Sequence, residues 1–271
     1  MGQEPSQPRA GSSIQVIGAG LPRTGTTSLA LALSILLAGP LYDRGAQIWH
    51  GRPSDYSDLI KMLHKTPMKS ASDRRFILRT LRHILDGCIA TTDTPGAQFV
   101  PELLEIWPDT KVICTIRDRK EWATSINQIG RASGSRSWML SLVLLLLPGL
   151  RYFTTYVSAL QHGRWGELYF RPGDANGYSA AIYERHIELL KSVIPEEKHV
   201  FYDVRDGREP LCGASAVRLP DDIPFPKLND SKSADQIARA VVMKILKAWA
   251  KFFGGGAFTV VSLCIGWRAW K

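Results

Sequence analysis

Cysteine is sparse in this sequence, and its four copies are scattered. Cys88, Cys114, Cys212 and Cys264 form no C-x-x-C pair, which argues against a structural zinc site or a disulfide scaffold and fits a reducing compartment. No cluster of ligand residues stands out elsewhere, so we expect no metal. Residues 1–12 lack the apolar core of a secretory signal, and we expect them to form a disordered tail.

Acidic residues are fewer than basic ones, with 25 Asp and Glu against 34 Lys and Arg, and the formal net charge is +9. This excess is compatible with an anionic ligand or surface but fixes no function by itself. The sequence has no zinc finger, no aromatic strand of the RNA-recognition kind and no long basic run. Nucleic-acid binding is therefore not expected.

Apolar runs alternate with helical patterns along the chain, and this alternation indicates an α/β fold with a central parallel sheet flanked by helices. With 271 residues, of which 45% are hydrophobic, the chain can bury a core as a single domain, which we place at 13–234. The expected strands are 14–20, 88–93, 111–117 and 199–204, and the expected helices are 26–37, 99–107, 121–129 and 178–194.

The loop after the first expected strand, GAGLPRTGTT, lacks the lysine of a nucleotide-hydrolase P-loop, because Thr26 follows its last glycine. It also departs from a dinucleotide fingerprint, since Arg23 occupies the position of the third glycine and would obstruct close helix–strand packing. A plain glycine-rich turn with a threonine helix cap is a further alternative.

A fourth interpretation is a loop that holds a different phosphate ester. Gly25 would let the backbone approach an anion, and the amides at the helix start would donate to it with help from the helix dipole. Arg23 would place a cation where charge develops on a departing group. LPRTGTTSL resembles the 5′-phosphosulfate loop of sulfotransferases. The hydroxyl donors in it are Thr24, Thr26, Thr27 and Ser28.

A second motif strengthens this resemblance. Arg117 ends an expected strand, and Ser125 follows eight residues later inside the next helix. A strand-end arginine is common and by itself has no specific meaning. In sulfotransferases, however, an Arg and a Ser at this spacing hold the 3′-phosphate of 3′-phosphoadenosine-5′-phosphosulfate through charge-assisted hydrogen bonds.

Together with DTPGAQFVPELLEIWPDTKVICTIRDRKEW and YERHIELLKSVIPEEKHVFYDVRDGREPLC, these motifs resemble the fungal P-loop sulfotransferase family from about residue 14 to residue 230. The resemblance implies a single P-loop NTPase-like domain and the donor named above. It also implies sulfuryl transfer to a hydroxyl of a small lipophilic acceptor, in fungal secondary metabolite biosynthesis. More weakly, it places Tyr202 near the nucleotide.

The general base is the main departure from this family, which commonly has a Tyr-His pair where this chain has Tyr42 and Asp43. An aspartate accepts a proton at neutral pH only if burial raises its pKa. Besides Asp43, the candidates are His186 and His50. A non-catalytic or repurposed nucleotide-binding or membrane scaffold protein stays an alternative, as does an NAD-dependent oxidoreductase, which Arg23 opposes.

The sequence also contains two long apolar segments. The run at 138–150 is too short to span a bilayer, and it is either a lid over a lipophilic acceptor or a core helix. In the helical tail at 235–271, residues 252–267 carry no charge and are flanked by Trp249, Trp267 and Trp270. This C-terminal hydrophobic helix predicts membrane association, with the enzyme at the cytoplasmic face of a membrane.

Overall fold

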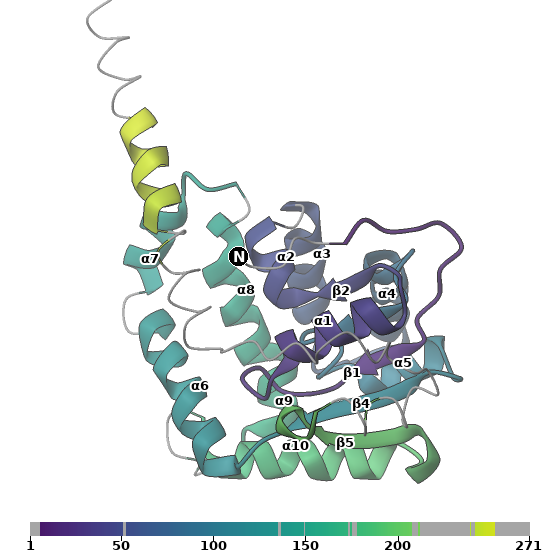
Figure 1. Ribbon diagram of the computed structural model, residues 1–271. Helices are drawn as coiled ribbons and strands as arrows, with labels where there is room; N and C mark the ends of the chain where they lie inside the picture. Colours follow the sequence, from purple (N-terminus) through teal and green to yellow (C-terminus); the bar gives the residue numbers. More distant parts are fainter. Residues whose placement is uncertain are drawn as a thin grey trace, which may run out of the picture.

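The computed structural model describes residues 6–50, 53–134, 137–148, 150–172, 174, 178–207, 211, 239 and 242–252. Its centre is a five-stranded sheet in the order β2-β3-β1-β4-β5, and every neighbouring pair is parallel (Figure 1). The predicted α/β architecture with a central parallel sheet is confirmed. The strands are β1 (Val16–Gly18), β2 (Leu41–Asp43), β3 (Ala90–Thr92), β4 (Lys111–Ile116) and β5 (His199–Asp203).

Helices fill the connections between the strands. Each of the strands and helices predicted between residues 14 and 204 overlaps an observed element, with ends that differ by a few residues. The helices are α1 (Thr26–Leu36), α2 (Arg44–His50), α3 (Pro53–Leu63), α4 (Ala71–Leu85), α5 (Val100–Ile106), α6 (Arg119–Gly134), α7 (Ser137–Leu144), α8 (Phe153–Leu160), α9 (Gly166–Tyr169) and α10 (Ala180–Val193). A π-helix at Gln161–Trp165 joins α8 to α9.

Alternation of side chains along the strands builds a core on each face of the sheet. Val16 belongs to a cluster with the buried leucines of α1, whereas its neighbour Ile17 belongs to the larger cluster formed with α3, α4, α5 and α8. β4 repeats this pattern, with Ile113 on the α1 side and Val112 on the other. Both faces are therefore buried, as expected for parallel strands.

β2 is a strand that the sequence pattern did not predict. Leu41 pairs with Ala90 and Asp43 with Thr92, so β2 forms the edge of the sheet beside β3. This pairing places Asp43 at the carboxyl end of its strand. Since all strands are parallel, that end lies at the same edge of the sheet as the loop after β1.

The two chain ends are described only in part. Residues 6–12 belong to the segment expected to be a disordered tail, and there the Arg9 amide donates to the Gly87 carbonyl at 2.9 Å. Apart from Phe252, the predicted hydrophobic helix at 252–267 lies outside the described residues. Within the residues that are described, no helix is both long and apolar enough to cross a membrane.

Candidate functional site

The loop between β1 and α1 ends at a glycine that no other residue could easily replace. Gly25 has φ +99°, and a Cβ there would lie 2.7 Å from the Val204 side chain. As the N-cap of α1 it supplies no side-chain hydrogen bond, and the first turn of α1 contains no acidic residue. The amides of this turn and the positive end of the helix dipole can therefore act on an anion.

Side chains from β4 and α6 hold the loop in place. Thr24 Oγ1 donates to the Leu21 carbonyl at 2.7 Å and lies 2.5 Å from Thr115 Oγ1 on β4. Trp122 Nε1 on α6 donates to the Pro22 carbonyl at 2.9 Å. The loop is thus fixed by bonds to its carbonyls and to Thr24. None of the described residues hydrogen-bonds with the hydroxyls of Thr26, Thr27 and Ser28 at the start of α1.

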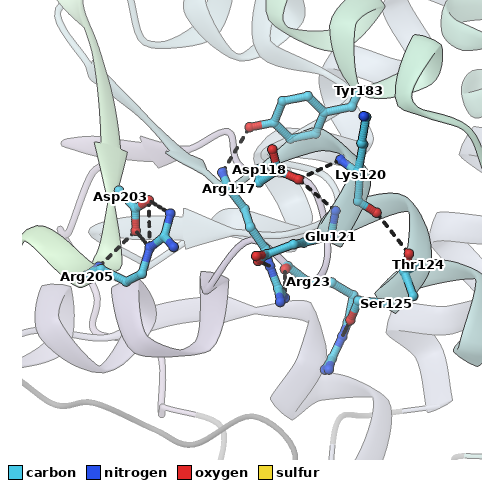
Figure 2. Close-up of polar contacts among 10 residues, drawn as sticks. All are labelled: Arg23, Arg117, Asp118, Lys120, Glu121, Thr124, Ser125, Tyr183, Asp203 and Arg205. Atoms are coloured by element: carbon cyan, nitrogen blue, oxygen red, sulfur yellow. Dashed lines mark hydrogen bonds and ion pairs between the residues drawn. The ribbon is translucent and has the colours of Figure 1, made fainter.

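The structure brings the two predicted phosphate-binding motifs together. Arg23, at φ +74°, donates from Nε to Ser125 Oγ at 3.1 Å. Arg117 donates from Nη1 to the Arg23 carbonyl at 3.4 Å, as Figure 2 shows. Glu121 accepts from Arg117 Nε at 3.2 Å, and about a third of the Arg117 side chain remains exposed. Two guanidinium groups and one hydroxyl therefore gather beside the loop.

The backbone around Arg117 is held by its neighbours. The Tyr183 hydroxyl accepts the Arg117 amide at 3.0 Å. Asp118 caps α6 by accepting the amides of Lys120 and Glu121, both at 2.9 Å (Figure 2). These backbone hydrogen bonds lower the pKa of Asp118, so its carboxylate stays charged and keeps the cap. The start of α6, and with it Ser125, is fixed relative to β4.

Arg205 is a cationic residue of this region that the sequence analysis missed. It follows β5 and pairs with Asp203 at 2.6 Å, and its side chain is 67% exposed (Figure 2). The hydrogen bond from Arg205 lowers the pKa of Asp203. The sequence feature that could have identified it is the basic residue in VRDG, which directly follows a predicted strand.

Tyr202 is placed differently from the expectation. It is 1% exposed, lies in the cluster beneath α1, and its hydroxyl donates to the Gly207 carbonyl at 2.5 Å. Its neighbour Asp203 instead ends the strand near Arg205. The Tyr202 ring therefore supports the turn after β5, and a direct contact with a nucleotide would require it to leave this cluster.

His186, predicted as a candidate base, has no nitrogen available for that role. It is 1% exposed, with Nε2 2.8 Å from the Ala19 carbonyl and Nδ1 2.8 Å from the Tyr169 hydroxyl. A carbonyl only accepts, so Nε2 carries the proton and Nδ1 accepts from Tyr169. Burial lowers the pKa of His186 to about 4. We therefore assign it to holding the loop. The side chain of His50 is not among those described.

Asp43 lies at the edge of the sheet where the reaction is predicted, but its carboxylate already accepts hydrogen bonds within the protein. Its carboxylate accepts from Thr92 Oγ1 at 2.9 Å and from the Ala46 amide at 3.1 Å, and it is 5% exposed. Burial raises its pKa above the ordinary value, against the effect of these hydrogen bonds. The direction of this shift is the one that a base requires, although both oxygens of the carboxylate already have donors.

Asp93, one residue beyond β3, is the carboxylate that the sequence analysis did not consider. It is half-buried with φ +61°, and one oxygen accepts the Thr94 amide at 2.7 Å. The turn after it passes over the end of β1, since a Cβ on Gly96 would lie 2.7 Å from the Gly18 carbonyl. Burial, together with the charge of Asp43, raises the pKa of Asp93 to about 6.

A buried cation accompanies these two carboxylates. Arg44 directly follows Asp43 and is 1% exposed, with its guanidinium 4.1 Å from the Tyr56 ring centre and 4.4 Å from that of Tyr156. Stacking between aromatic rings suits the planar, weakly hydrated arginine. Its charge opposes the rise in the pKa of Asp93.

A cavity of about 490 Å³ lies between α3, α7, α8 and the π-helix, and Asp43, Arg44 and Asp93 are not among its lining residues. His64, His162, Trp138 and Ser141 contribute to its wall, and the last two come from the apolar run predicted as a lid or a core helix. Its lining includes no residue of the β1–α1 loop, nor Arg117 or Ser125. Within the described residues, no group of three His, Cys, Asp or Glu side chains could hold a metal ion.

Comparison with known proteins agrees with this geometry. The chain is 24% identical over 259 residues to the "Ava biosynthesis cluster protein M" of Aspergillus versicolor, a match that covers 93% of this chain and 95% of that protein. A family model described as a sulfotransferase domain matches residues 15–234, which include the β1–α1 loop, Arg117, Ser125 and all five strands. The predicted membership is confirmed, and the chain belongs to the sulfotransferase-domain family.

Proposed function

We propose that the protein transfers a sulfuryl group from 3′-phosphoadenosine-5′-phosphosulfate to a hydroxyl of a small lipophilic acceptor. The observation that carries the proposal is the hydrogen bond from Arg117 to the Arg23 carbonyl, because it puts the two predicted phosphate sites within the reach of one nucleotide. The start of α1 would hold the 5′-phosphosulfate, with Arg23 and the hydroxyls of Thr24, Thr26, Thr27 and Ser28 nearby.

The other phosphate of the donor would lie beside Arg117 and Ser125. A guanidinium and a hydroxyl match a phosphate monoester through charge-assisted hydrogen bonds. Ser125 Oγ now accepts from Arg23 Nε, and its own proton remains available to a phosphate. Arg205, exposed at the end of β5, adds a third cation to this side.

The reaction would be a direct in-line displacement at sulfur. The acceptor oxygen forms a bond to sulfur while the bond from sulfur to the bridging oxygen breaks, and the electron pair stays on the departing 3′,5′-bisphosphate of adenosine. Arg23 would stabilise the charge that grows on that oxygen. The proton of the acceptor hydroxyl would go to a carboxylate at the ends of β2 and β3.

Among these carboxylates, Asp93 is the better proton acceptor. The Asp93 side chain is less buried than that of Asp43. Among the described residues, only Thr94 donates hydrogen bonds to its carboxylate. Its pKa of about 6 brings it nearer to neutral pH than an ordinary aspartate. Asp43 would act by keeping that pKa high, because two neighbouring carboxylates resist simultaneous ionisation.

A role in fungal secondary metabolite biosynthesis is part of the proposal. The name of the similar Aspergillus versicolor protein, which refers to a biosynthesis cluster, supports it. A lipophilic alcohol or phenol is the expected class of acceptor, and a panel of phenols and terpenoid alcohols incubated with labelled donor would identify it.

A non-catalytic nucleotide-binding protein is the second candidate, and it is favoured by Asp43 in the place of the histidine usual in this family. Thermal shift with 3′-phosphoadenosine-5′-phosphate, ATP and NAD separates the candidates. At 100 times its Kd a specific ligand adds about 2.7 kcal/mol of stability, or roughly 5–10 °C for a domain of this size. We expect that shift with 3′-phosphoadenosine-5′-phosphate and not with ATP or NAD. Label transfer to an acceptor then distinguishes an enzyme from a binding protein, and a shift with NAD alone would refute both.

A further inference from the structure

Exposed apolar side chains gather on two short helices that the proposed reaction does not use. On α7, Trp138 is 70% exposed and Leu142 is 51% exposed, and Leu145 in the next turn is 55% exposed. On the helix at 242–252, Leu246 is 58% exposed. We call the exposed apolar side chains of 138–145 and 242–252 the apolar face. In the described part of the chain, Phe170 is the only large exposed hydrophobic residue outside it.

The two helices form a continuous surface. Trp249 Nε1 donates to the Val143 carbonyl at 3.0 Å, and the Trp249 ring packs edge-on against Phe252 with centres 5.9 Å apart. The helix at 242–252, yellow in Figure 1, lies beside α7 and projects away from the sheet. Contiguous apolar surface of this kind marks an interaction site in a soluble domain.

The charges around this surface all have one sign. Lys244, Lys247 and Lys251 are exposed, and their spacing of three and four residues puts them on one side of the helix. Val242 and Leu246 lie on the opposite side of the helix. The sequence has no Asp or Glu in 137–148 or in 242–252. A helix with an apolar side and a lysine-rich polar side is typical of one that lies in a membrane interface.

We propose that the apolar face lies on the surface of a bilayer that contains anionic lipid, with its apolar side chains among the headgroups and its lysines on lipid phosphates and carboxylates. The helices would lie in the interface and would not span it, in keeping with the absence of a spanning helix among the described residues. This surface goes beyond the proposed function and does not depend on it. It agrees with the predicted location at a cytoplasmic membrane face, which stays a prediction.

A lipid surface fits this face better than a second copy of the chain does. A second copy packed through the same face would offer these lysines no acidic partner, because neither 137–148 nor 242–252 contains Asp or Glu. Anionic lipid supplies the missing charge. The chain also continues from Phe252 with an uncharged stretch that extends to Trp267, so the apolar character of the face is carried further along the sequence.

Flotation of the full chain with vesicles tests the proposal. We expect binding to phosphatidylcholine vesicles that contain 25% phosphatidylserine, weaker binding to pure phosphatidylcholine, and loss of the difference at high salt. Changing Lys244, Lys247 and Lys251 to Gln should reduce the partition coefficient on the order of 100-fold, because each surface lysine contributes about fivefold. The double variant Leu142→Ser/Leu145→Ser should also bind more weakly, and it leaves the cavity wall intact.

Matched controls test whether vesicle binding requires this surface or only positive charge and exposed hydrophobic residues anywhere on the protein. Arg75, Arg79 and Arg82 are three exposed cations on α4 with spacings of four and three, and their replacement by Gln should leave vesicle binding within about twofold. Phe170→Ser removes an exposed hydrophobic residue outside the apolar face and should also have little effect. Near-ultraviolet circular dichroism and the shift with 3′-phosphoadenosine-5′-phosphate confirm that each variant folds.

Three results would overturn the proposal. The first is a wild-type chain that does not float with anionic vesicles. The second is equal binding by the wild type and by both variants of the apolar face, which would assign lipid affinity to another part of the chain. The third is a dimer in solution that these variants dissociate while no vesicle binding is seen, because the face would then belong to a second copy.

Discussion

Arg117 donates from Nη1 to the main-chain carbonyl of Arg23, although 94 positions separate them in the sequence. The same arginine of the loop donates in turn to Ser125. Through these two contacts, the loop after β1 and the start of α6 share one cluster of donors. This relationship is the structural support for the proposal that one nucleotide contacts both motifs.

Removal of the Arg117 side chain should weaken nucleotide binding without unfolding the protein. Arg117→Ala should raise the Kd of 3′-phosphoadenosine-5′-phosphate about 10- to 100-fold, since a charge-assisted hydrogen bond is worth roughly 1.5–3 kcal/mol. Adenosine 5′-phosphosulfate, which lacks the 3′-phosphate, should bind both proteins alike. Titration calorimetry measures both ligands, and Arg75→Ala serves as a control. An equal loss for the two ligands would contradict the assignment of Arg117 to the 3′-phosphate.

Gly25→Ala should destabilise the protein and abolish nucleotide binding. It combines a strained left-handed backbone with a Cβ 2.7 Å from Val204, and we expect a loss of roughly 2–4 kcal/mol. Gly11→Ala is the control, because Gly11 has φ +80° but no heavy atom would lie within 4 Å of the added carbon. It should cost about 1 kcal/mol. Urea denaturation compares the two, and equal losses would show that the Val204 contact is unimportant.

Asp93→Asn should make the protein more stable above pH 6 and lower its activity. A folded-state pKa raised from 3.8 to about 6 costs nothing below pH 3.8, and the cost grows between pH 3.8 and about 6 and is complete above that. Two pKa units correspond to about 3 kcal/mol, the upper limit of the gain. Urea denaturation should show a gain of up to about 3 kcal/mol at pH 7.5 and only about 1 kcal/mol at pH 4.5, and the exposed Asp86→Asn should show none.

The activity of the wild type should depend on the same group. If Asp93 accepts the proton, kcat/KM rises with pH through about 6, and Asp93→Asn removes this limb while it retains the thermal shift with 3′-phosphoadenosine-5′-phosphate. A variant that keeps both the rate and the pH profile would eliminate Asp93 as the base and leave the donor site standing.

His186→Gln should reduce stability and have a small effect on turnover. The pKa of His186 is depressed to about 4 in the folded chain, so its contribution to stability is complete above pH 6.5 and is lost as pH falls towards 4. The glutamine can donate to the Ala19 carbonyl but cannot reproduce both contacts. Thermal melts from pH 4 to 7 measure the change, and a folded variant whose kcat falls more than 100-fold would restore His186 as the base.

The elements that sequence patterns predict best are those with long, uninterrupted signals. β4 reads as a continuous apolar run, and α10 has a regular helical pattern over many residues. β2 has only Leu41–Asp43 and is preceded by Gly39 and Pro40, so its local pattern resembles a turn. Its identity as a strand comes from pairing with β3, which is remote in sequence.

Within the candidate site, the arginines and hydroxyl residues could be predicted from the sequence, whereas Asp93, the proposed proton acceptor, could not. Arg23, Arg117 and Ser125 occur in local motifs, and their chemistry can be read from residue type and spacing. The environment of Asp93 depends on Asp43 in another strand, a non-local effect. Tyr202 shows a different limit, because a strand pattern does not reveal which face of the sheet a side chain occupies until the helices are placed.

Trp122 and His186 hydrogen-bond to carbonyls of the loop after β1, so the loop takes its shape during folding. A ligand that arrives at this loop does not have to organise it, and little conformational entropy is lost on contact. Encounter should then proceed at a rate set by diffusion and by attraction to the neighbouring arginines, with no slow rearrangement in between.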